Sequence, residues 1–113
     1  MITASFEKEE GKFLSLRVDG HAGQAENGKD IVCSAASILA YTVAQTLTQM
    51  YKQGWLKKKP HINLKEGKSL ITCVPKQGYF DECLMVFFVA EVGYHLLTTS
   101  YPQYVEVKAF GEA

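Results

Sequence analysis

Residues 13–37, FLSLRVDGHAGQAENGKDIVCSAAS, pass through three different sequence patterns. Apolar and polar residues first alternate, which is typical of a half-buried strand. The alternation stops over Gly20–Lys29, where three glycines predict a loop. Asp30 is a good N-cap for a helix over residues 31–50, which is rich in Ala, Leu, Ile and Val at helical spacing. The stretch therefore predicts a strand, a loop and a helix in that order.

Similar patterns extend to both ends of the chain. Residues 2–6 alternate in the same way and predict a hairpin with the strand that follows the turn at Gly11. After the first helix we expect two strands around Gly67, a helix from Tyr79 to about Thr98, and a last strand at residues 105–109. The predicted fold is α+β, a ββαββαβ sandwich in which two helices pack on a mixed or antiparallel sheet. Its 113 residues form one domain.

Composition limits the classes of function. Twelve basic and twelve acidic residues cancel, which argues against an electrostatic nucleic-acid binder. Charged residues precede any apolar run long enough for a signal peptide, and no uncharged apolar run is long enough for a membrane span. Three cysteines are an odd number, so we expect no disulfide framework, a reducing compartment and a cytoplasmic protein.

The candidate catalytic groups are His21 and Cys33. If Asp30 caps the helix, Cys33 lies at its third position, where free backbone N–H groups and the helix dipole favour a thiolate. The same N–H groups are placed to receive an oxyanion. His21 follows the strand and is a candidate general base. A cysteine near a helix start is also a common buried apolar residue, so this pattern has a structural explanation too.

The other cysteines and histidines predict no second site. Cys73 and Cys83 fall in apolar strand and helix patterns and are expected in the core. No Cys-x-x-Cys or His-x-x-x-His pair occurs, so we expect no metal site and no cofactor.

The run GHAGQAENGKDIVCSAAS, residues 20–37, closely resembles the signature of the bacterial ribosomal-processing cysteine proteases (Prp). The order of elements is similar to that family over essentially the whole chain. The resemblance implies that His21 and Cys33 are the catalytic dyad of a small cytoplasmic homodimer. It also implies a peptide substrate, the precursor of large-subunit ribosomal protein twenty-seven, cut after two phenylalanines and before an alanine. Gln24, Asn27 and Ser34 depart from common family residues and affect the expected substrate contacts of the loop.

Several neighbours are expected to bind substrate or support the dyad. Asp30 either caps the helix or orients His21 as a third catalytic member. Ser37 lies one turn after Cys33 and either hydrogen-bonds at the site or packs in the helix. The remaining supporting residues are Gly20, Ala22, Gly23, Gly28 and Ser34.

Two other functions compete with an endopeptidase. In a non-enzymatic ribosome-assembly or binding module, His21 and Cys33 would be structural. In a thiol redox or acyl-transfer enzyme the same cysteine would react, but no resolving cysteine is close to it in sequence. We expect no membrane or direct nucleic-acid partner.

Overall fold

The computed structural model describes residues 1–21 and 26–111, with residues 26–30 described as backbone alone. Its elements confirm the predicted order ββαββαβ. They are β1 (Ile2–Glu9), β2 (Phe13–Asp19), α1 (Glu26–Lys52), β3 (His61–Lys65), β4 (Lys68–Cys73), α2 (Phe80–Ser100) and β5 (Val105–Lys108).

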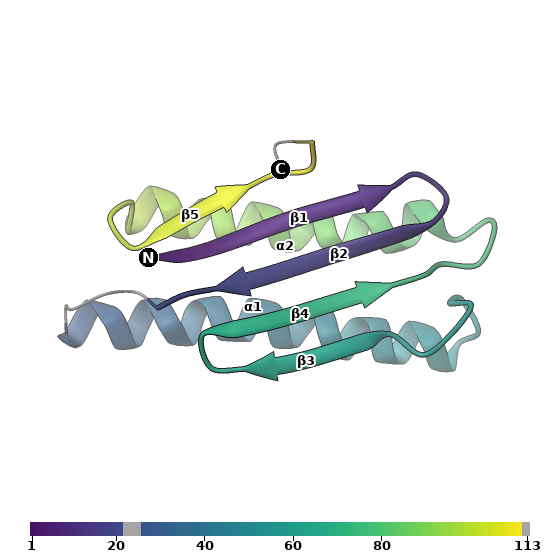
Figure 1. Ribbon diagram of the computed structural model, residues 1–113, viewed down its shortest axis with the longest axis horizontal. Helices are drawn as coiled ribbons and strands as arrows, with labels where there is room; N and C mark the ends of the chain where they lie inside the picture. The colour runs from purple at the N-terminus through teal and green to yellow at the C-terminus, as the bar shows by residue number, and fades with distance from the viewer. Residues whose placement is uncertain (22–25, 112–113) are drawn as a thin grey trace.

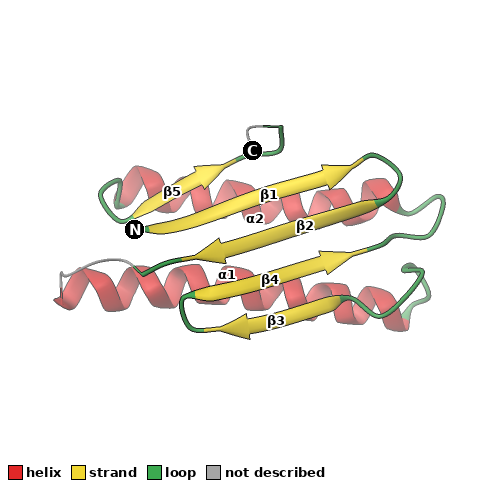
Figure 2. Cartoon of the chain, viewed as in Figure 1, coloured by secondary structure: helices red, strands yellow, loops and turns green. Residues whose placement is uncertain are grey.

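The elements form two layers, a five-stranded sheet and a pair of helices (Figure 1). The strand order is β3-β4-β2-β1-β5, and all neighbours are antiparallel except β1 and β5, which are parallel. The sheet is therefore mixed. Both helices cover the same face of the sheet, and Figure 2 shows the opposite face free of any helix.

Side chains of β1 and β2 alternate between the two faces of the sheet, and the apolar ones lie on the face that the helices cover. Ile2, Ala4 and Phe6 on β1 are at most 3% exposed, and Leu14 and Leu16 on β2 are fully buried. The polar residues between them point to the open face, because successive side chains of a strand alternate between faces. One face of the sheet is therefore part of the core and the other is polar.

The two helices pack directly against each other. The buried Tyr94 hydroxyl on α2 donates a hydrogen bond of 2.8 Å to the Ala36 carbonyl on α1. Gly93 lies against Leu39, so close that a Cβ on Gly93 would lie 2.7 Å from a Leu39 methyl carbon. These contacts hold α1 against α2 in the turns that follow the candidate catalytic cysteine.

The first helix starts earlier than its sequence pattern predicts. It begins at Glu26, so Asp30 is an interior residue rather than the N-cap, and the predicted loop Gly20–Lys29 is shorter. The helix was expected to begin after Gly28, but a glycine in a helix interior costs only about 1 kcal/mol relative to alanine. Adding turns to an existing helix is easier than nucleating one, so the long apolar segment that follows supports this extension.

Both helices are long and apolar enough, by length and composition alone, to cross a membrane. In the structure each lies along the sheet and contributes core residues, among them Leu47 of α1 and Phe87 of α2. Only 33% of the apolar span in α1 and 22% of that in α2 is buried, so packing against the sheet covers part of the apolar surface of each helix and leaves the rest exposed.

Candidate active site

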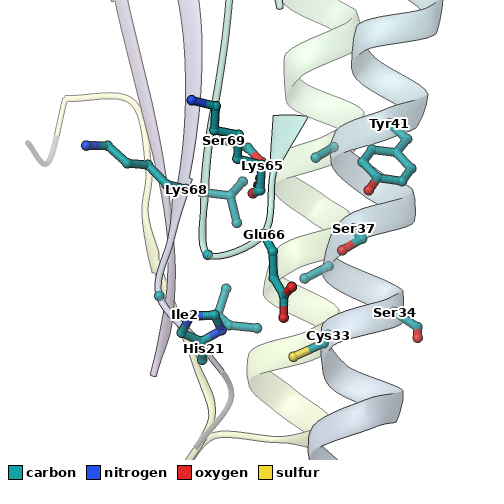
Figure 3. A pocket seen from close by; sticks show the side chains of 15 residues that line it. Ile2, His21, Cys33, Ser34, Ser37, Tyr41, Lys65, Glu66, Lys68 and Ser69 are labelled. Atoms are coloured by element: carbon teal, nitrogen blue, oxygen red, sulfur yellow. Dashed lines mark hydrogen bonds between the residues drawn. The ribbon is translucent and has the colours of Figure 1, made fainter. Parts of the chain in front are cut away.

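A cavity of about 410 Å³ opens between the N-terminal half of α1, the end of β2 and the turn between β3 and β4 (Figure 3). It brings together three segments that are far apart in the sequence. Its lining residues are Ile2, Val18, Gly20, His21, Cys33, Ser34, Ala36, Ser37, Ala40, Tyr41, Lys65, Glu66, Gly67, Lys68 and Ser69. The predicted pair His21 and Cys33 therefore shares one cavity.

Cys33 lines this cavity from α1 and is half-buried, whereas Cys73 and Cys83 are buried. It is the eighth residue of α1, so the prediction that it lies in the first helical turn is wrong. Backbone N–H groups this far inside a helix donate to carbonyls four residues earlier, and the dipole acts mainly at the terminal turns. The thiol is accessible, but the helix N-terminus does not activate it.

Cys73 and Cys83 lie in the core, as their sequence patterns predict, and the structure also places them in contact with each other. A hydrogen bond with the Cys83 thiol, and then burial, raise the pKa of Cys73 far above that of an ordinary thiol. Because a thiol attacks as its thiolate, Cys73 is unsuited to nucleophilic chemistry. Cys33 is therefore the best placed of the three cysteines to react.

His21 is exposed and lies two residues beyond the end of β2. Backbone contacts fix its position: the Gly20 N–H donates 2.9 Å to the Gly67 carbonyl, and the Met1 nitrogen donates to the His21 carbonyl. Gly20 has φ +94° and lies so close to Met1 that a Cβ would be 2.1 Å from the Met1 carbonyl oxygen. Glycine is required there, which gives the predicted supporting role of Gly20 a structural reason.

Within the described residues, no hydrogen bond joins the His21 imidazole to the Cys33 thiol. Figure 3 shows Glu66 extending from the β3–β4 turn toward the space between the two side chains. Catalytic hydrogen bonds are often long in a ligand-free site and shorten when substrate binds. The arrangement is that of an open site with both groups on its wall.

The other predicted supporting residues divide into three groups. Ser34 and Ser37 line the cavity with Gly20, and both serines are exposed. Gly28 and Asp30 lie within α1, so Gly28 is not in a loop and Asp30 is not the N-cap. Ala22 and Gly23 lie outside the described residues.

Sequence patterns did not identify the wall opposite α1. It is formed by the β3–β4 turn and its flanks, Lys65, Glu66, Gly67, Lys68 and Ser69, and Tyr41 adds an aromatic ring from α1. This wall meets His21 because the last pair of the β2–β4 ladder is Asp19 with Lys68. In the described part of the chain, no group of three or more His, Cys, Asp or Glu side chains could hold a metal ion.

An accessible thiol and an imidazole on the wall of one open cavity are the groups that a cysteine peptidase needs. The model of the family described as "Cysteine protease Prp" matches residues 1–106. The chain belongs to this family and is a cysteine protease, which argues against both a non-enzymatic binding module and a redox enzyme. No curated protein matches the chain.

Solved structures show the same fold. The chain is similar to SMU.848 from Streptococcus mutans, with 24% identity, a TM-score of 0.68, and 97% of this chain and 94% of that one covered. It is also similar to the essential ribosomal processing protease Prp from S. aureus in complex with a covalently linked product peptide. That match has 21% identity, a TM-score of 0.67, and 96% and 99% coverage. The same S. aureus protease with a substrate peptide matches at 20% identity, a TM-score of 0.68, and the same coverage.

Proposed function

We propose that this chain is a cytoplasmic endopeptidase that removes the N-terminal extension of the large-subunit ribosomal protein twenty-seven precursor, cutting after a Phe-Phe pair. The observation that carries the proposal is the shared cavity of His21 and Cys33. Membership of the protease family supports the reaction class. The resemblance of residues 20–37 to the ribosomal-processing signature supports the substrate.

In the proposed mechanism His21 acts as general base and Cys33 as nucleophile. The imidazole takes the thiol proton, and the thiolate attacks the carbonyl carbon of the scissile peptide bond. The imidazolium then gives the proton to the leaving amine, which leaves a thioester on Cys33. His21 next takes a proton from water, and the resulting hydroxide attacks the carbonyl carbon of the thioester. The cleaved extension leaves with a new carboxyl terminus, and the imidazolium returns its proton to the sulfur, which restores the thiol.

The test is cleavage of the precursor protein by the purified chain, followed by mass spectrometry. We expect one cut after Phe-Phe in the wild type, and a loss of at least about 10³-fold in Cys33→Ala and His21→Ala. His61→Ala is a matched control, because His61 is exposed on β3 and does not line the cavity. Near-normal cleavage by either dyad variant refutes the proposal, as does an intact precursor with the wild type.

We propose further that the enzyme is a homodimer built on the outer face of its helices. Large apolar side chains are exposed there, with a groove of about 230 Å³ between α1 and α2. They are Ile31, Ile38 and Tyr41 on α1 and Met85, Phe88, Val89, Val92 and Leu96 on α2, each at least 44% exposed. This many large, exposed apolar side chains on two neighbouring helices is typical of a subunit interface.

Sedimentation at micromolar concentration tests the dimer. We expect twice the monomer mass for the wild type and a monomer for Phe88→Asp. Leu64→Asp is the control, because Leu64 is an exposed apolar residue on the edge strand β3 rather than on either helix. A monomeric wild type excludes the dimer without affecting the proposed chemistry.

A further inference from the structure

The turn between β3 and β4 lies directly beside the candidate base. Lys65 and Lys68 pair across this hairpin, which leaves Glu66 and Gly67 as its two turn residues. The same Lys68 pairs with Asp19 at the end of β2, just before the chain reaches His21. Two strand ladders therefore fix the turn relative to the backbone that carries the imidazole.

The imidazole of His21 occupies the space that a side chain at position 67 would fill. A Cβ on Gly67 would lie 2.7 Å from Nε2 and 2.8 Å from Cε1 of the His21 ring. Non-bonded carbon contacts are normally about 3.5–4.0 Å, so a methyl group and the ring could not both occupy these positions. The Nε2–Cε1 edge of the ring occupies space that is free only because residue 67 is glycine.

A second hairpin turn in the chain allows two reasons for a glycine to be distinguished: the positive φ of the backbone, and the close contact with His21. Gly67 has φ +76°, and Gly11 in the β1–β2 turn has φ +75°. Both positions favour glycine for the same conformational reason. A Cβ on Gly11 would meet nothing within 4 Å, so only Gly67 has an additional reason to lack a side chain.

We propose that Gly67 is a positioning residue that sets the place of the His21 imidazole in the cavity that Cys33 lines. The inference rests on the proposed role of His21 as general base. The ring lies at the end of a rotatable side chain, whereas the turn is held by two ladders and by the hydrogen bond between Gly20 and Gly67. A side chain at position 67 therefore displaces the imidazole rather than the turn. Proton transfer depends on the position of the ring, and a shift of about 1 Å in a reacting group can cost roughly 10²-fold in rate.

The first test compares Gly67→Ala with Gly11→Ala in the precursor cleavage assay. We expect kcat to fall roughly 10- to 100-fold in Gly67→Ala with little change in KM, and to stay within about twofold in Gly11→Ala. Melting temperatures should fall equally, because the backbone strain is the same. Gly67→Asn and Gly11→Asn repeat the comparison with a residue that tolerates positive φ, so the test survives if an alanine variant does not fold.

The second test does not depend on any substrate. The imidazole signals of the three histidines are followed by NMR against pH in the same four variants. We expect the His21 signal to move in both Gly67 variants, and His61 and His95 to stay in place. The rate at which iodoacetamide alkylates Cys33 is measured against pH as well, and its profile should change only in the Gly67 variants.

An unmoved His21 signal in the Gly67 variants, or equal kcat values in the matched Gly67 and Gly11 variants, overturns the positioning role. If the wild type leaves every precursor intact, the proposed protease substrate fails by itself. The His21 signal and the alkylation profile of Cys33 then still decide whether Gly67 sets the imidazole.

Discussion

Replacing Gly20 with alanine tests how the strand end before His21 is held. Gly20 combines a positive φ of +94° with direct contact to the backbone of the first strand. Positive φ alone costs a non-glycine residue about 1–2 kcal/mol. Gly78 has almost the same φ, +92°, and open space around it, so Gly78→Ala measures the conformational cost alone.

The additional cost at Gly20 comes from its neighbour. A Cβ there would lie 2.1 Å from the Met1 carbonyl oxygen, which no choice of rotamer can relieve. The start of β1 must move, and with it Ile2, which is 3% exposed and donates its N–H to the Tyr104 carbonyl at 2.8 Å. Full burial of an isoleucine side chain is worth about 1.5–3 kcal/mol, so partial loss costs on the order of 1–2 kcal/mol. Gly20→Ala should therefore cost about 2–4 kcal/mol, roughly twice the cost of Gly78→Ala.

Urea unfolding measures both variants. With a slope of about 2 kcal/mol per molar, the midpoint of Gly20→Ala should lie about 0.5–1 M below that of Gly78→Ala. The slopes should agree, so that the difference in midpoint reports stability. Equal midpoints would mean that the β1 backbone accommodates the methyl group freely, and the structural reason given for Gly20 would be wrong.

Three other outcomes follow from buried groups. Tyr94→Phe removes the hydrogen bond to Ala36 and should lower the free energy of unfolding by about 0.5–1.5 kcal/mol, measured by urea titration. Burial raises the pKa of Tyr94, so as pH rises the tyrosine loses its proton in the unfolded chain before it does so in the folded one. The free energy of unfolding should therefore fall as pH rises above about 10, and it should fall less in Tyr94→Phe. In native buffer iodoacetamide should label Cys33 alone, with Cys73 and Cys83 reacting only in urea; early labelling of the buried pair would contradict their placement.

The strands were predictable because their pattern depends on local burial. Alternation at Ile2, Ala4 and Phe6 identifies the buried face directly, and the structure confirms it. The pairing of β1 with β5 was not predictable, because it joins residues about a hundred positions apart. Alternation says which side of a strand is buried, but it does not say which strand lies beside it.

The helix start shows how a local signal can mislead. Asp30 is a favourable capping residue, and Gly28 resembles the end of a loop. Such preferences are worth only about 1 kcal/mol each, and a long helix packed on a sheet can override them. The sequence named Cys33 as a candidate catalytic residue, and the structure places it on the cavity wall, but at a different position in the helix from the predicted one.

The turn at Glu66 and Gly67 was predicted as part of a hairpin, yet its place beside His21 was not. The separation is 46 positions between His21 and Gly67, and only the β2–β4 register brings them together. The positive φ of a hairpin turn is enough to explain why a glycine occurs there. The sequence therefore contains no signal that distinguishes Gly67 from Gly11. The difference between them exists only in three dimensions.

The position of Cys33 also changes which groups can stabilise charge during the reaction. Backbone N–H groups at and after the eighth residue of α1 are used within the helix, so they are not available to an oxyanion. Among the described residues, six further side-chain donors lie on the cavity wall: the hydroxyls of Ser34, Ser37, Tyr41 and Ser69 and the ammonium groups of Lys65 and Lys68. Half of these six come from β3 and β4 rather than from α1. Charge stabilisation by the described residues therefore depends on the hairpin that faces Cys33 as much as on the helix that carries it.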